Sequence, residues 1–232
     1  MADSREQAAV VIGASGGIGA AMARRLESSG RFAMVHALSR SDTGFDLEDE
    51  DSIAAAAARV GQGPALTLVF IATGVLHHGF EPERGWRALQ ADHLLRDFRV
   101  NAVGPALVAR HFLPLLPRDR RAVFAALSAR VGSIGDNRLG GWHSYRASKA
   151  ALNMILRNLA IELARTHPQA VVAGLHPGTV DTGLSEPFQK GVKPDKLFTA
   201  EHSAERLLAV MDALTPADSG RVFAWDGQVI PE

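Results

Sequence analysis

The chain of 232 residues contains no cysteine, a single tyrosine and no excess charge of either sign. Without cysteine it has no means of forming a disulfide, an iron–sulfur cluster, a thiolate zinc site or a thiol nucleophile. Its 25 lysine and arginine residues equal its 25 aspartate and glutamate residues. This balance argues against the basic surface of a nucleic-acid-binding or membrane-surface protein, so we expect small molecules or other protein chains as partners.

Long hydrophobic runs are also absent. The longest stretch free of aspartate, glutamate, lysine and arginine covers residues 60–80, and its apolar part, residues 65–72, has only the length of a strand. Residues 1–7 are mostly polar and lead directly into an apolar segment, without the pattern of a secretory signal. We therefore expect a soluble, cytoplasmic protein.

Short apolar runs alternate with helical segments along the whole chain. We expect strands at residues 8–12, 32–38, 65–72, 122–127, 170–175 and 222–225, a turn at 41–44, and helices at 18–28, 49–60, 89–113, 144–164 and from 199. Unbroken apolar strands separated by helices are typical of a parallel sheet covered on both faces. The sequence therefore predicts an α/β fold, a doubly wound parallel sheet of the Rossmann type, with residues 1–232 as one domain.

A glycine-rich turn joins the first expected strand to the first expected helix. Gly13, Gly17 and Gly19 are spaced as G-x-x-x-G-x-G, with Ser15 inside the turn and Ile18 at the start of the helix. Glycines let the backbone approach a pyrophosphate closely, and the free N–H groups at a helix N-terminus bind it. The turn therefore predicts a dinucleotide-binding site.

The same turn also fits the G-x-S-x-G pattern of serine hydrolases, over residues 13–17. Such a nucleophile elbow normally follows several strands, because an earlier loop supplies part of the oxyanion hole. Here the turn follows the first strand of the chain, which favours the dinucleotide interpretation.

The cofactor is distinguished about 20 residues after the glycine turn, at the end of the second strand. An acidic residue there bonds the ribose 2′-OH of NAD, whereas an arginine accommodates the 2′-phosphate of NADP. Ser39, Arg40 and Ser41 occupy this position and suit a phosphate. We expect NADP(H) rather than NAD(H). The alternative, NAD(H), depends on Asp42, which is close enough in sequence to bond a 2′-OH if the loop folds back.

The only tyrosine, Tyr145, lies four residues before Lys149 in an expected helix, so the two side chains share one face. A phenol with its unperturbed pKa of about 10 is a weak base at neutral pH. A cation one helical turn away stabilises the phenolate and lowers that pKa. The spacing therefore predicts an acid/base pair.

In their order and spacing, the glycine turn, Asn101, the Tyr145/Lys149 pair and residues 177–182 resemble the short-chain dehydrogenase/reductase family. The resemblance covers nearly the whole chain, and residues 131–153 are most similar to the C-factor and carbonyl-reductase-like branch. It implies an NADP-linked enzyme that reduces a small-molecule carbonyl or oxidises the matching alcohol, with the cofactor carrying the hydride.

The resemblance also implies roles for individual residues. Tyr145 would exchange a proton with the substrate oxygen, Lys149 would bond the nicotinamide ribose and lower the pKa of Tyr145, and Asn101 would hold a proton-relaying water. The other implied cofactor-binding positions are Asp46 and Leu47 near the adenine, Ala72 and Gly74 after the third strand, Pro177 and Gly178 in a turn, and Val180 and Thr182 at the nicotinamide carboxamide.

The family's carbonyl-orienting serine has no direct counterpart, since the position three residues before Gly132 is Ala129. We expect Ser128 to replace it, with Ser133 on the following loop as the alternative. Adjacent strand residues point to opposite faces, so Ser128 requires that the strand is bulged or has already ended. The missing serine also leaves open a dinucleotide-binding signalling or sensor protein with little or no turnover.

The remaining expectations concern three histidines, one loop and one helix. His77, His78 and His143 show no metal-ligand spacing, so we expect no metal. The loop at residues 183–198 offers Leu184, Phe188 and Lys190 as substrate contacts. The helix at residues 150–163 is apolar on most of its circumference, which predicts a homodimer or homotetramer.

Overall fold

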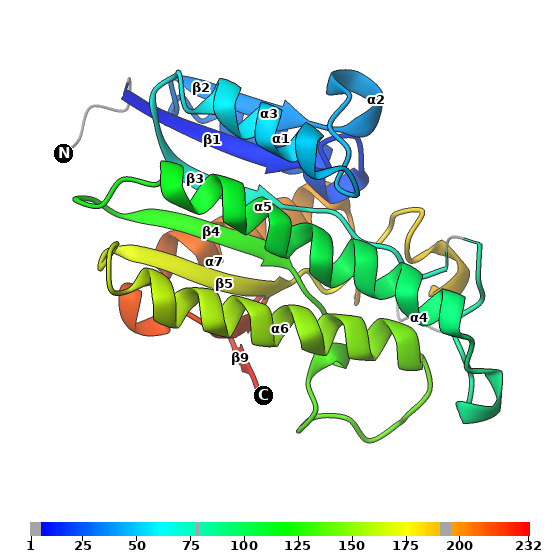
Figure 1. Ribbon diagram of the computed structural model, residues 1–232. Coiled ribbons are helices and arrows are strands. Elements are labelled where there is room, and N and C mark those ends of the chain that lie inside the picture. The colour runs from blue at the N-terminus through cyan, green and yellow to red at the C-terminus, as the bar shows by residue number, and fades with distance from the viewer. Residues whose placement is uncertain (1–5, 78, 191–195) are drawn as a thin grey trace.

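The computed structural model describes residues 6–77, 79–190 and 196–232. Its centre is a seven-stranded sheet in the order β2-β1-β3-β4-β5-β8-β9 (Figure 1). All neighbouring strands are parallel except β9, which pairs antiparallel with β8. The strands are β1 (Gln7–Ile12), β2 (Met34–Leu38), β3 (Ala65–Ile71), β4 (Ala122–Leu127), β5 (Ala170–His176), β8 (Val222–Ala224) and β9 (Val229–Ile230).

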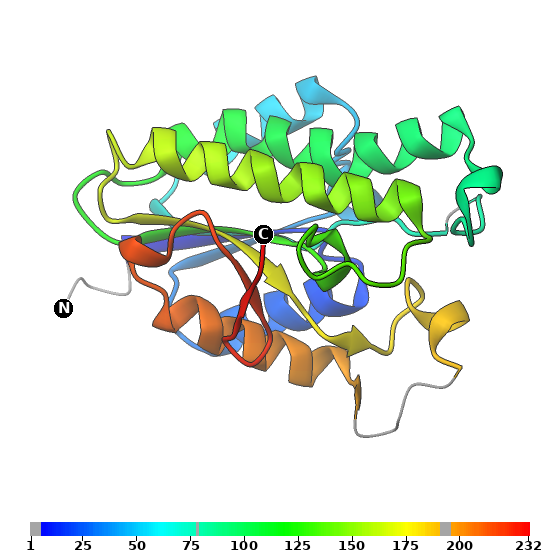
Figure 2. The same ribbon diagram turned by 90° about the horizontal axis from the view of Figure 1, so that it is seen from below.

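Helices cover both faces of the sheet, as Figure 2 shows. Alternate strand residues face opposite layers, so Phe124 belongs to one buried core and Val123 to the other. The core that contains Phe124 packs under α3 (Glu50–Val60), α5 (Gly104–Phe112) and α6 (His143–Leu163), whereas the other packs under α1 (Gly17–Ser28) and α7 (Ala200–Ala213). The predicted doubly wound α/β fold is confirmed.

The long helix expected at residues 89–113 is interrupted. It consists of α4 (Ala91–Phe98), a π-helical segment η3 (Arg99–Val103) and α5. Pro105 has no N–H group and cannot donate the usual helical hydrogen bond to the carbonyl of Asn101, four residues earlier. Single π turns inside α-helices occur frequently at functional sites, and this one carries Asn101.

Smaller departures concern short elements. The turn expected at residues 41–44 is a short helix, α2 (Arg40–Thr43), and a two-stranded sheet of β6 (Thr179–Val180) and β7 (Leu197–Phe198) was not expected. Among the described residues, no helix is both long and apolar enough to cross a membrane.

Candidate active site

A cleft of about 440 Å³ opens at the carboxyl ends of β1, β2 and β3. The chain order reverses between β1 and β3, and ligands of open α/β sheets bind at such a switch point. Eight predicted site residues line this cleft: Gly13, Ser15, Ser39, Arg40, Asp46, Leu47, Ala72 and Gly74. The sequence did not single out several other lining residues, including Thr73, Val75, Leu76, Arg96 and Val100.

The three glycines of the turn are required by close packing. A Cβ atom on Gly19 would lie 2.1 Å from the Gly13 carbonyl oxygen, and one on Gly17 would lie 2.7 Å from Thr182 Cγ2. Gly13 has a positive φ of 85°. Gly16, the N-cap of α1, provides no side-chain hydrogen bond to the helix. The turn therefore leaves the N–H groups at the start of α1 free of a side-chain cap and brings Thr182 to the same place.

The residues after β2 separate the two cofactor interpretations. Ser39 is the N-cap of α2: its hydroxyl accepts from Asp42 N at 3.1 Å and donates to Asp42 Oδ2 at 2.6 Å. The Asp42 carboxylate is thus bonded within its own turn. Arg40 is exposed and lines the cleft, whereas Asp42 is not among the lining residues.

Tyr145 and Lys149 are both buried on one face of α6, as their spacing predicted. Lys149 Nζ donates to the Leu127 carbonyl at 2.8 Å and lies 5.8 Å from the centre of the Tyr145 ring. A Cβ atom on Gly74 would lie 3.6 Å from Lys149 Nζ and 3.4 Å from Asn101 Oδ1. Gly74 therefore lies in the wall of the cleft and, at the same time, next to Lys149 of the buried pair.

Burial dominates the ionisation of this pair. Burial, followed by the nearby Asp97 carboxylate, raises the pKa of Tyr145 above its ordinary value. Burial lowers the pKa of Lys149 to about 8, although Asp97 opposes that shift. Desolvation of the phenol therefore outweighs the neighbouring cation in this structure, and the role of Lys149 in lowering the pKa of Tyr145 stays a prediction.

The Asn101 side chain connects three elements. Its Oδ1 accepts from Val75 N at 2.9 Å, and its Nδ2 donates to the Val75 carbonyl at 2.9 Å and to Ser148 Oγ at 3.0 Å. Asn101 is fully buried. It therefore fixes the π-helical segment against the loop after β3 and against α6, on the face that carries Lys149.

Ser128 does not face Tyr145, which corrects the expectation for the substrate-orienting hydroxyl. Ser128 N still donates to the Leu175 carbonyl of β5, at 2.8 Å, so the strand pairing continues through this residue without a bulge. The Ser128 hydroxyl donates to Asn153 Oδ1 at 2.6 Å. Asn153 is two helical turns beyond Tyr145, about 12 Å along the axis.

Ala129 and Tyr145 instead belong to one buried apolar cluster with Leu76. Ser133, the alternative, accepts through its hydroxyl from Asp136 N at 3.0 Å. The hydroxyls of Ser128 and Ser133 are therefore both bonded to residues other than Tyr145.

An aromatic wall next to Tyr145 consists of Phe188, an expected substrate contact, and Trp142, which was missed from the sequence. The Trp142 ring centroid lies 6.4 Å from that of Tyr145 and 4.9 Å from that of Phe188. Trp142 has a φ of 49°, the only positive value at a non-glycine residue in the described part of the chain. It follows Gly140 and Gly141, which also have positive φ, and this glycine pair was the available signal.

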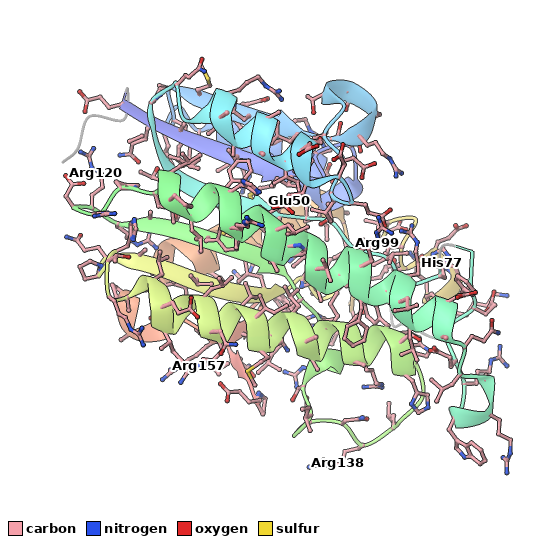
Figure 3. The ribbon with its side chains drawn as sticks, viewed as in Figure 1. Glu50, His77, Arg99, Arg120, Arg138 and Arg157 are labelled. Carbon is pink, nitrogen blue, oxygen red and sulfur yellow. The ribbon has the colours of Figure 1, made fainter. Side chains whose placement is uncertain are left out.

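The remaining predicted positions lie around the loop after β5. Gly178 has a positive φ of 81°, the Pro177 carbonyl accepts from Ser203 Oγ at 3.1 Å, and Val180 is buried in β6. His77, at the end of the molecule to which the strands point (Figure 3), has its Nε2 atom 2.9 Å from the Gly183 carbonyl. His78 and residues 191–195 of the expected substrate loop lie outside the described residues.

Comparison with known proteins agrees with this arrangement. A family model described as enoyl-(acyl carrier protein) reductase matches residues 13–225. The chain is 33% identical, over 94% of its length and 96% of the relative, to 1-hydroxy-2-glutathionyl-2-methyl-3-butene dehydrogenase of Rhodococcus sp. (strain AD45). It is 37% identical, over 60% of its length and 78% of the relative, to the C-signal protein of Myxococcus xanthus.

A solved structure extends the comparison to the fold. The NADPH-bound carbonyl reductase from chicken fatty liver superposes with a TM-score of 0.81 at 25% identity, over 98% of this chain and 94% of that one. Together with the sequence relatives, this match contradicts the serine-hydrolase interpretation of the glycine turn. The chain belongs to the short-chain dehydrogenase/reductase family and is an oxidoreductase acting on alcohol or carbonyl groups.

Proposed function

We propose that the chain is an NADP(H)-dependent reductase of small-molecule carbonyls, or a dehydrogenase of the matching alcohols, with Tyr145 as the acid/base. The observation that carries this proposal is the burial of Tyr145 and Lys149 side by side on α6, where Gly74 joins them to the cleft. NADPH-bound proteins are also among the solved structures with this fold.

The cleft has the donors that a dinucleotide needs. Thr73 Oγ1 is buried in its wall with no hydrogen-bond partner among the described residues. The N-terminus of α1 suits a pyrophosphate. Arg40 and Ser39 would hold a 2′-phosphate, while Val180 and Thr182 would lie toward the nicotinamide. The bound cofactor would supply or accept the hydride.

Proton exchange would fall to Tyr145. During carbonyl reduction its hydroxyl would donate a proton to the substrate oxygen; the raised pKa of Tyr145 keeps the phenol protonated but makes it a weaker acid. Alcohol oxidation needs the phenolate instead, so it requires the stabilising charge of Lys149. Asn101 would act as a positioning residue for the π-helical segment and, through its bond to Ser148, for the part of α6 that carries Lys149.

Large apolar side chains are exposed on the adjoining helical segments α4, η3 and α6: Leu95, Val103, Met154 and Ile161. We propose that a second copy covers them in a homodimer or homotetramer, which sedimentation velocity tests directly. A cytoplasmic location and a single domain over residues 1–232 also stay predictions.

A second function, dinucleotide sensing with little turnover, is favoured by one observation: an alanine, Ala129, at the position of the substrate-orienting serine. The two functions differ in one assay. NADPH consumption with a panel of aldehydes, ketones and quinones, abolished by Tyr145→Phe, supports the reductase. NADPH binding without Tyr145-dependent turnover supports the sensor.

A further inference from the structure

Three ionisable side chains that the proposed mechanism does not use are buried where α4 packs against the first turn of α6. Glu83 and Asp97 each have 1% of their side-chain surface exposed, and His93 between them has 4%. Acidic side chains are almost never buried this completely unless they are paired. Phe80 stacks on the His93 ring with 4.9 Å between centroids and screens it from water.

The imidazole lies between the two carboxyl groups. His93 Nδ1 is 3.2 Å from Glu83 Oε1, and His93 Nε2 is 3.7 Å from Asp97 Oδ2. The second distance is too long for a hydrogen bond. Within the described residues, Asp97 Oδ2 is buried without any hydrogen-bond partner. The Asp97 end of this cluster is thus unsatisfied.

The Glu83 end is fixed to the first turn of α6. Glu83 accepts hydrogen bonds from the Ser144 hydroxyl and from Ser144 N. Trp142, the N-cap of α6, provides no side-chain cap, so the Glu83 carboxylate caps the helix in its place. Burial is the largest single influence and raises the pKa of Glu83, but the Ser144 hydrogen bonds, the backbone of Glu83 itself and the neighbouring His93 together lower it below its ordinary value.

Asp97 lies between two sets of side-chain contacts that connect α4 and η3 to α6. His93, Asp97 and Asn101 follow one another at intervals of four residues and so form one stripe. Glu83 connects the His93 end of that stripe to Ser144, and the Asn101 side chain bonds Ser148 at the other end. The Asp97 carboxyl group therefore faces the turn of α6 that carries Tyr145 and Lys149.

Charged groups on three elements act on the ionisation of Asp97. Burial and repulsion by Glu83 raise the pKa of Asp97 to about 7, although Arg96 on the same helix and Lys149 on α6 oppose the shift. In return, the Asp97 charge raises the pKa of both Tyr145 and Lys149. Groups that interact this closely titrate as a set rather than singly.

We propose that Asp97, buried beside Glu83 and His93, is a positioning residue whose gain or loss of a proton sets the pH range in which Tyr145 exchanges a proton with the substrate. The proposal rests on the function proposed for Tyr145. Its effect on the ionisation of Tyr145, however, is measurable without turnover.

Because Tyr145 is the only tyrosine, the near-ultraviolet absorbance of tyrosinate reports its ionisation alone, with Tyr145→Phe as the blank. Asp97→Asn removes the negative charge and is expected to lower the pH midpoint of Tyr145 ionisation by about 1 unit. Asp92→Asn, an exposed carboxylate in the first turn of the same helix, is the matched control and should leave the midpoint unchanged. Equal midpoints in the two variants would overturn the proposal.

A measurement on the unaltered chain covers the case in which Asp97→Asn fails to fold. With aspartate labelled at its carboxyl carbon, nuclear magnetic resonance should show one residue titrating at about pH 7. If every aspartate titrates near its ordinary pKa of about 4, the proposal is wrong. A shifted tyrosinate midpoint combined with full turnover in Tyr145→Phe would show that Asp97 acts on the ionisation of Tyr145, but it would overturn both the proposed function and the link to proton exchange with the substrate.

Discussion

Ala129 and Tyr145 lie in one buried apolar cluster, while the hydroxyl of the neighbouring Ser128 is turned away and bonded to Asn153. The position from which a serine would orient a substrate carbonyl is therefore occupied by a methyl group. The face of Tyr145 is bordered by apolar and aromatic side chains, among them Leu76 and Trp142. Substitutions at Ala129 and at Ser128 should therefore have different effects.

Ala129→Ser should place a hydroxyl beside Tyr145. A hydrogen bond to the substrate oxygen that forms in the transition state contributes about 1 kcal/mol or somewhat more. We expect kcat/KM for the best carbonyl substrate to rise about 5- to 10-fold, measured by NADPH oxidation. A loss of activity with unchanged folding would show that the site requires an apolar group here.

Ser128→Ala should act on stability rather than on catalysis. It removes the bond to Asn153 and leaves a partly buried amide oxygen without its donor, which costs about 1 kcal/mol of unfolding free energy. Denaturant unfolding should show this loss, whereas kcat/KM should change by less than about twofold. If instead the turnover rate decreases by about two orders of magnitude, Ser128 is a catalytic residue after all.

Arg40→Ala tests the cofactor preference. Loss of a charged hydrogen bond to the 2′-phosphate should raise the Kd for NADPH by about 10- to 100-fold and leave that for NADH nearly unchanged. Arg120→Ala, at the opposite end of the sheet in Figure 3, is the control. Equal weakening of NADPH and NADH would contradict the NADP assignment.

Gly19→Ala should disrupt the glycine turn, because its Cβ atom would lie 2.1 Å from the Gly13 carbonyl oxygen. Overpacking of this kind costs about 1–3 kcal/mol, so we expect Tm to fall by several degrees and NADPH binding to weaken. Gly85→Ala is the matched control, since its added Cβ meets nothing within 4 Å. An unchanged Tm and Kd in Gly19→Ala would show that the turn relaxes freely.

The buried Asp97 should make stability depend on pH. Its pKa rises from 3.8 to about 7 in the folded protein, so the folded state favours the protonated carboxyl group. The resulting stabilisation is fully present below about pH 4 and is lost as pH rises through about 7. Asp97→Asn should remove this part of the pH dependence of unfolding, measured by denaturant titration at several pH values. An unaltered pH profile would contradict the buried, titrating carboxyl group.

Much of the fold was predictable because its signals are local. Apolar strands buried on both faces read as unbroken runs, and the spacing of Tyr145 and Lys149 places them on one face of α6. The direction of Ser128 was not predictable, because it depends on the continued pairing of Ser128 with β5.

The cluster of Glu83, His93 and Asp97 was hidden for a different reason. Its members lie on a loop and a helix whose packing against α6 has no local signature. The pKa of Tyr145 was not predictable from helical spacing alone, because the spacing shows the neighbouring cation but not the burial of the phenol.

Proton exchange between Tyr145 and the substrate is tested most directly by comparing the wild-type chain with Tyr145→Phe. NADPH oxidation by each is measured with the same carbonyl substrate, alongside NADPH binding to each. We predict that the substitution lowers kcat at least about 100-fold and leaves the Kd for NADPH nearly unchanged. Turnover by Tyr145→Phe within about threefold of the wild-type rate would contradict the proposed role of Tyr145.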